Sequence, residues 1–255
     1  MKELEGKVAL VTGAGQGIGQ GIAFALADAG VSIMVTGRTQ QKLLNTVAEI
    51  NERGGQALAL TCDVKRKEDL ERSVSQCIAQ YGNLNILVNN AGNAHGLDPI
   101  QSGSIADWDA MMDINVKGLL YVSKAILPGM LSRNAGHIIN IGSTAGKEVY
   151  PKGNVYCASK HAVDAINQGM RLDLNGTGIK VGAINPGLVE TEFSEVRFKG
   201  NTERAETVYQ GYTPLRPEDI ADIIWFTVTR PPHVNIADLT VMCLDQASST
   251  IINKN

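Results

Sequence analysis

The stretch Lys7-Val-Ala-Leu-Val-Thr-Gly-Ala-Gly-Gln-Gly-Ile-Gly19 decides the fold. Its first six residues form an apolar run typical of a buried parallel strand, and Ile18–Ala29 carries apolar residues at helical spacing. Between the two, Gly13, Gly17 and Gly19 let the backbone turn sharply and come close to a ligand. A pyrophosphate at this turn would meet the free N–H groups and the positive end of the helix. The sequence therefore predicts strand, tight turn and helix, the start of a dinucleotide-binding fold.

The rest of the chain continues this alternation. Its 255 residues, 44% of them hydrophobic, suffice for one large α/β domain, and no linker or repeat interrupts the strand-like and helix-like segments. Strand-like runs at Val31–Val35 and Gln56–Thr61 join the first strand, and the last run is Leu239–Leu244. We predict a single Rossmann domain over residues 1–255, a doubly wound, seven-stranded parallel sheet with helices on both faces.

Charge and hydropathy argue against several classes of function. The net charge is -3 and the basic residues are scattered, so we expect neither a nucleic-acid partner nor binding to anionic membranes. The start Met-Lys-Glu-Leu-Glu does not resemble a signal peptide and no apolar run is long enough to span a bilayer, which indicates a cytoplasmic protein. Cys62, Cys77, Cys157 and Cys243 lack metal-ligand spacing, so we expect no metal and no disulfide.

A tyrosine and a lysine one helical turn apart are the strongest candidates for chemistry. The segment Val155–Leu174 has helical spacing, which places Tyr156 and Lys160 on one face. A cation this close typically lowers a tyrosine pKa of about 10 by roughly 1 to 3 units, so that the phenol can exchange a proton near neutral pH. Ser143 lies at the end of the strand-like run His137–Gly142, at the edge where parallel sheets bind ligands.

Together these motifs resemble the short-chain dehydrogenase/reductase family over nearly the whole chain. Asn89-Asn-Ala-Gly92 follows the strand-like run Leu84–Val88, Asn115 lies in a later helix, and Pro186-Gly187 follows the run Ile179–Asn185. In the C-terminal third, two segments resemble the bacterial NADP-dependent 3-hydroxy acid dehydrogenases, also called serine or allo-threonine dehydrogenases. These segments are Phe193–Gly200 and Pro231–Ile236.

The resemblance implies roles for the candidate residues. Ser143 would orient the substrate oxygen, Tyr156 would transfer the proton, Lys160 would bind the nicotinamide ribose and lower the tyrosine pKa, and Asn115 would hold a water. Negative charge that develops on a carbonyl oxygen needs such donors in place beforehand. The resemblance also implies a homotetramer that acts on a small molecule, with long helices around Trp108–Arg133 and Val155–Leu174 paired across a two-fold axis.

The end of the second strand indicates the cofactor. The sequence there is Thr36-Gly37-Arg38-Thr39, without the Asp or Glu that usually binds the ribose 2′-hydroxyl of NAD. Glycine leaves room for a 2′-phosphate, and Arg38 can bind it. We expect NADP(H), with NAD(H) less favoured; an arginine that only caps a turn would leave the preference open. With the resemblance, the expected cofactor-binding residues are Gly13, Gly15, Gln16, Gly17, Ile18, Gly19, Arg38, Asp63, Val64, Asn90, Ala91, Gly92, Tyr156, Lys160, Pro186, Gly187, Val189 and Thr191.

Substrate choice is expected to depend on residues 191–212, a charged segment interpreted as a lid. Arg197 or Lys199 could pair with a substrate carboxylate, although solvated lid charges explain them equally well. His95, in a loop after the Asn-Ala-Gly motif, is a third candidate beside Ser143 and Tyr156. Three interpretations remain: a dehydrogenase of short-chain 3-hydroxy acids or hydroxy amino acids, a reductase of 3-oxoacyl thioesters or bulky ketones and aldehydes, and a non-catalytic NADP-sensing module.

Overall fold

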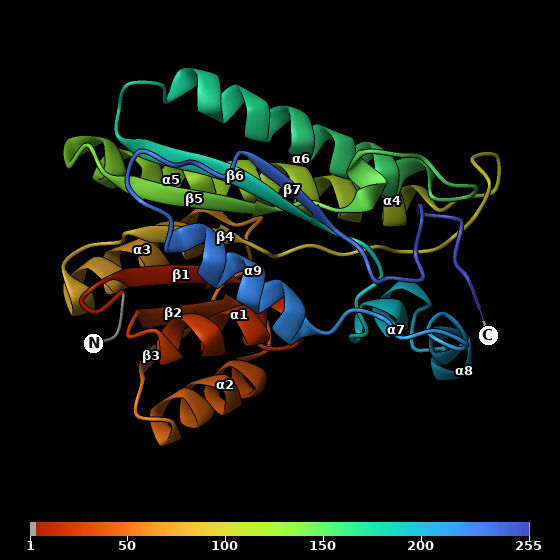
Figure 1. Cartoon of the computed structure of the whole chain (residues 1–255), viewed down its shortest axis with the longest axis horizontal. Helices are drawn as coiled ribbons and strands as arrows, with labels where there is room; N and C mark the ends of the chain where they lie inside the picture. Colours follow the sequence, from red (N-terminus) through yellow and green to blue (C-terminus); the bar gives the residue numbers. More distant parts are fainter. Residues whose placement is uncertain (1–3, 255) are drawn as a thin grey trace.

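The computed structural model describes residues 4–254 and contains one seven-stranded parallel sheet (Figure 1). The strand order is β3-β2-β1-β4-β5-β6-β7, and every neighbouring pair runs parallel. This confirms the predicted doubly wound sheet; residues 1–3 and 255 of the predicted domain lie outside the described residues. The strands are β1 Val8–Thr12, β2 Ser32–Gly37, β3 Gln56–Thr61, β4 Ile86–Asn89, β5 Gly136–Ile141, β6 Ile179–Pro186 and β7 Asp238–Val241.

Helices cover both faces of the sheet and bury two separate apolar cores. The first core lies under α1, α2 and α9, and the second under α3, α5 and α6, as the two layers in Figure 1 show. Within residues 4–254, no helix is both long and apolar enough to cross a bilayer. The helices are α1 Gly17–Asp28, α2 Gln40–Glu52, α3 Lys67–Tyr81, α4 Ile105–Met112, α5 Leu119–Ser132, α6 Asn154–Asp173, α7 Phe193–Arg197, α8 Thr202–Thr207 and α9 Pro217–Val228.

Two segments differ from the sequence-based expectation. The long helix expected around Trp108–Arg133 is divided, because a π-helical turn at Asp113–Gly118 separates α4 from α5. The last strand, expected at Leu239–Leu244, ends at Val241 because the chain then turns and the Gln246 side chain accepts a hydrogen bond from Leu188 N at 2.9 Å. The spacing of apolar residues in the sequence indicates neither of these two differences.

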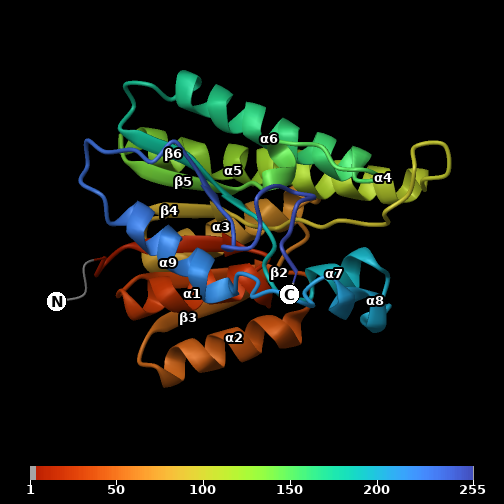
Figure 2. The ribbon, with the colours of Figure 1, turned by 45° about the vertical axis from the view of Figure 1, so that its right-hand side comes forward.

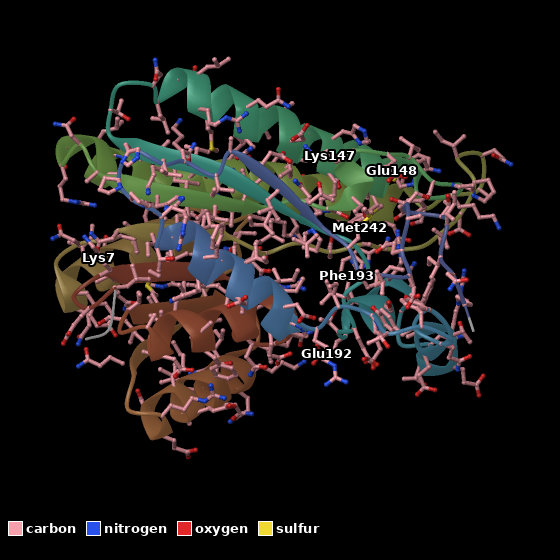
Figure 3. All side chains as sticks on the ribbon, viewed as in Figure 1. Lys7, Lys147, Glu148, Glu192, Phe193 and Met242 are labelled. Atoms are coloured by element: carbon pink, nitrogen blue, oxygen red, sulfur yellow. The ribbon has the colours of Figure 1, made fainter. Side chains whose placement is uncertain are left out.

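The short helices α7 and α8 lie together at one end of the sheet, beyond its main body (Figure 2). They follow β6 directly and fall inside the segment interpreted as a lid. Figure 3 labels Glu192 and Phe193 of this segment. The segment is therefore attached at the carboxyl edge of the sheet, where ligands of this fold class bind.

A buried histidine at the start of β5 makes stability depend on pH. His137 is 5% exposed, its Nε2 has no hydrogen-bond partner, and burial lowers its pKa from 6.5 to about 3. Between about pH 6.5 and 3, His137 therefore binds a proton in the unfolded chain but not in the folded protein. The free energy of unfolding falls as pH falls through this range. The free energy of unfolding should drop by about 2 kcal/mol from this group between pH 7 and 5.

Replacing the histidine tests that expectation. His137→Leu should remove this loss, whereas His233→Gln, at an exposed histidine, should keep it. Urea unfolding of both variants at pH 7 and 5 measures the difference. The same acid sensitivity in all three proteins would assign it to other groups.

Candidate active site

A cavity of about 590 Å³ opens at the carboxyl edge of the sheet. Every residue expected from the sequence to hold the cofactor lines it, as do Ser143 and Arg197. His95 lies instead in a small adjoining pocket that also contacts Tyr156 and Arg197. Neither cavity is lined by Asn115 or Lys199. The fold thus brings the predicted cofactor residues to one place, with a volume typical of cofactor sites.

The glycine-rich turn is shaped for close approach of an anion. Gly17 has φ of 56°, a left-handed conformation that favours glycine, and a Cβ on Gly19 would stand 2.5 Å from Gly13 O. At the start of α1, residue Gln16 makes no side-chain capping hydrogen bond, and the first turn carries no acidic residue. Its first N–H groups therefore remain available to a pyrophosphate, so this turn fits a dinucleotide.

Asn90, the residue after β4, stabilises the glycine-rich turn through hydrogen bonds. Its Nδ2 donates to Thr12 O at 2.8 Å and to Gly13 O at 3.2 Å, and its main-chain N–H donates to Thr12 Oγ1 at 3.0 Å. These bonds fix the strand end to the glycine turn. The contact of Asn90 with an adenosine ribose stays a prediction.

The corner beyond β2 holds two cations, one of which the sequence interpretation missed. Arg38 is exposed at the cavity lip, and Lys42, in the first turn of α2, lines the same cavity. The ammonium of Lys42 donates a hydrogen bond to Gln16 Oε1. The signal in the sequence is a basic residue four positions after Arg38.

Asp63, which follows β3, also lines the cavity, and its Oδ2 lies 3.9 Å from Lys65 Nζ.

The tyrosine and lysine lie in the first two turns of α6 and are buried, each 8% exposed. The Lys160 ammonium donates to Ile141 O at 2.9 Å, and burial lowers the pKa of Lys160 to about 8. Burial raises the pKa of Tyr156, while the Arg197 guanidinium and the Ser143 hydroxyl lower it. The expected net lowering of the Tyr156 pKa is therefore wrong for the protein alone, because desolvation outweighs the effect of the Arg197 guanidinium.

Ser143 and Asn115 are held by local bonds. The Ser143 hydroxyl accepts from Ala145 N at 3.1 Å and starts the 3₁₀ turn Thr144–Gly146. Asn115, in the π-helical turn, accepts from Asn93 N at 2.8 Å and donates to Ser159 Oγ at 3.0 Å. The side chain of Asn115 thus ties the loop after β4 to α6. A water held at this residue stays a prediction.

An ion triad fixes the turn after Ser143. Lys147, labelled in Figure 3, lies 2.7 Å from a carboxylate oxygen of Asp164 in α6 and 2.7 Å from one of Asp238 in β7. The three side chains are partly exposed, which limits the stabilisation that they provide. Their geometric effect is to hold the Ser143 turn against the helix that carries Tyr156.

The two lid cations have different surroundings. The guanidinium carbon of Arg197 lies 5.1 Å from the centroid of the Tyr156 ring, its Nη2 donates to the hydroxyl of Tyr150, and its Nε is buried without a partner. Lys199, by contrast, forms an ion pair with Asp107 at 2.9 Å. The structure therefore places Arg197 beside the proposed proton donor and Lys199 away from it.

His95 and Tyr150 complete the surroundings of the lid. His95 Nε2 is 2.8 Å from Asn93 Nδ2, and burial lowers the pKa of the His95 ring, which favours its neutral form. The main-chain N–H of the next residue, Gly96, donates to Arg197 O at 3.0 Å and joins the loop to the lid. Tyr150 has no distinguishing signal in the sequence; only the fold brings it to Arg197.

Comparisons with known proteins agree with this geometry. The profile of the short chain dehydrogenase family matches residues 7–202. The NADP-dependent 3-hydroxy acid dehydrogenase YdfG of Salmonella typhi is 44% identical over 241 residues, covering 94% of this chain and 96% of that protein. Sulfoacetaldehyde reductase 2 of Chromohalobacter salexigens is 39% identical, covering 95% and 96%. The closed form of a serine dehydrogenase complexed with NADP⁺ superposes with a TM-score of 0.92 at 42% identity, covering 97% of this chain and 99% of that one.

Proposed function

The chain belongs to the short-chain dehydrogenase/reductase family, and on this basis we propose that it transfers hydride between NADP(H) and a short-chain 3-hydroxy acid or hydroxy amino acid. Support comes from relatives similar over almost their whole length, whose names specify NADP and a 3-hydroxy acid or serine. Within the site, the glycine turn and Arg38 suit the phosphates of that cofactor.

Arg197 is the observation that carries the choice of substrate. Its guanidinium lies among the rings of Tyr150, Tyr156 and Phe193, and among residues 4–254 it pairs with no carboxylate. A partly buried charge without a counter-ion is costly, and the buried Nε of Arg197 also lacks a partner. A substrate carboxylate would supply both the missing charge and the missing acceptor. Because Lys199 is already paired with Asp107, we assign this role to Arg197.

The proposed roles of the other residues follow from their surroundings. When bound, NADP(H) supplies or accepts the hydride. Tyr156 keeps its proton because burial raises its pKa, so it can deliver that proton to an oxygen on which negative charge develops. Ser143, fixed in its turn, donates a second hydrogen bond to the same oxygen. Lys160, anchored by Ile141 O, would hold the nicotinamide ribose.

The remaining cofactor residues have proposed places along the cavity. Asp63 and Val64 would lie against the adenine, and Asn90 to Gly92 would border its ribose. The turn after β6 would cover the nicotinamide through Pro186, Gly187 and Thr191, with Val189 beside them. All of these residues line the same cavity, which supports the assignment.

We further propose that residues 191–212 form a lid over this cavity and that the protein is a cytoplasmic homotetramer. The lid proposal is supported by α7, whose residues line the cavity, and by Val208 and Tyr209 after α8, which line it as well. Apolar side chains exposed on α5 and α6, among them Tyr121 at 43% and Leu172 at 79%, are suited to subunit contacts. The four cysteines are free, which suits a reducing compartment.

A sulfonated aldehyde is a second candidate substrate. The relationship to a sulfoacetaldehyde reductase favours it, and a sulfonate would satisfy the guanidinium of Arg197 as a carboxylate does. Both candidates share a short carbon chain that ends in an anion.

Comparing a free acid with its ester tests whether the protein recognises an anionic or a neutral substrate. Arg197→Ala should raise the apparent KM for a 3-hydroxy acid roughly 10- to 100-fold more than for its uncharged methyl ester, because only the acid loses an ion pair. Arg197→Lys should recover part of the loss. Lys199→Ala serves as the matched control and should change acid and ester alike. Steady-state kinetics of the three variants with both substrates measure the ratio; equal effects of Arg197→Ala on acid and ester would reject an anionic substrate.

A further inference from the structure

The cavity corner between β2 and α2 holds more positive charge than Arg38 alone provides. Arg38 and Lys42 both line it, and among residues 4–254 neither forms an ion pair with a carboxylate. The recorded partner of the Lys42 ammonium is the neutral side-chain amide of Gln16. Two cations therefore face this corner without a counter-ion.

Backbone packing holds Lys42 at this position. A Cβ on Gly15 would stand 3.1 Å from Lys42 Cβ, so the first turn of α2 lies directly against the glycine turn. The amide of Gln16, on that turn, then reaches the ammonium from the opposite side. The side chain of Lys42, although exposed, is thereby held at the edge of the cavity.

The start of α2 adds no negative charge. The first turn of α2 carries no acidic residue, and its capping residue Thr39 makes no side-chain hydrogen bond. The positive end of the α2 dipole is therefore uncompensated at the same corner. Dipole and cations together suit a group with more than one negative charge.

We propose that Lys42 is a second cation for the 2′-phosphate of NADP(H), and that Gln16 is the positioning residue that holds it there. This inference rests on the proposed function, because it assumes a cofactor with that phosphate. A phosphate monoester carries about -1.5 to -2 charges near pH 7, so one guanidinium leaves part of the charge unmatched. Arg38 and Lys42, on adjacent elements, would bind the group from two sides.

Binding of the isolated cofactor tests the proposal without turnover. Lys42→Ala should weaken NADPH and 2′,5′-ADP on the order of 10-fold or more, as expected for the loss of one charge-assisted hydrogen bond, and leave NADH and 5′-ADP within about twofold. Lys42→Arg should retain most of the affinity for the phosphorylated pair. Gln16→Ala should produce a smaller loss in the same direction, because the lysine keeps its charge but loses its anchor.

The controls make each outcome decisive. Lys67→Ala removes an 80% exposed lysine of α3 that does not line the cavity, and should change neither binding constant. Titration by ligand fluorescence or calorimetry, with circular dichroism to verify folding, gives the constants. Unchanged NADPH binding in Lys42→Ala, or equal losses for NADPH and NADH, would overturn the role of Lys42. A parent protein that binds NADH as tightly as NADPH would instead overturn the NADP(H) assignment on which the inference rests.

Discussion

Replacement of Tyr156 by phenylalanine is expected to lower kcat roughly 10²- to 10⁴-fold, the usual contribution of a positioned acid, and to leave NADPH binding nearly unchanged. The phenol is buried beside Ser143 and Arg197, whereas the ring alone supplies the packing that Phe193 contacts at 5.7 Å between centroids. Loss of the hydroxyl therefore removes the proton donor and keeps the shape. Single-turnover kinetics and cofactor titration measure the two effects separately.

A matched tyrosine outside the site controls for general effects of the substitution. Tyr81, at the end of α3, does not line the cavity, and Tyr81→Phe should behave as the parent does. Turnover by Tyr156→Phe within tenfold of the parent would assign the proton to another group.

Replacement of Lys160 by methionine should affect both binding and chemistry. The lysine is 8% exposed and its ammonium is anchored by Ile141 O, so methionine keeps most of the packing while removing a positioned cation. We expect NADPH affinity to fall on the order of tenfold and kcat to fall roughly 10²-fold or more, because a ribose contact and the charge beside the tyrosine are lost together.

An arginine in the same position gives the control for charge alone. Lys160→Arg keeps the positive charge on a larger side chain and should recover part of the cofactor affinity. Cofactor titration alongside turnover distinguishes the two contributions. If Lys160→Met binds NADPH as tightly as the parent does, Lys160 does not contact the ribose. If its kcat equals that of the parent, the charge of Lys160 does not contribute to catalysis.

Local patterns predicted the sheet well. The strand β3 spans Gln56–Thr61 as predicted, and β1, β2, β5 and β6 begin and end within one or two residues of their apolar runs. Buried parallel strands leave this continuous signal because both of their faces are covered. The short β7 was predicted too long, since the turn after it depends on the contact of Gln246 with Leu188, 58 residues away in sequence.

The site was predictable where residue identity fixes the chemistry, and unpredictable where tertiary distances decide it. The positions of Tyr156, Lys160 and the glycine turn follow from spacing within one element. The partner of Lys199 is Asp107, and Tyr150 meets Arg197, through contacts that no local pattern reports. The pKa of Tyr156 was predicted in the wrong direction because its dominant cause is burial, which depends on everything packed around the phenol.

We propose that this protein transfers hydride between NADP(H) and a short alcohol or carbonyl compound that carries an anion. The test measures initial rates with NADP⁺ and with NAD⁺ on 3-hydroxypropionate, 3-hydroxybutyrate, serine and the methyl ester of one of these acids. Bulky secondary alcohols are assayed in the same way, and 3-oxoacyl thioesters are assayed with NADPH. We predict the highest kcat/KM for one of the free acids with NADP⁺, at least tenfold above its ester and above the same acid with NAD⁺. A preference for a thioester, a bulky alcohol or NAD⁺ would contradict this assignment of substrate and cofactor, and cofactor binding without turnover of any substrate would contradict an enzymatic function.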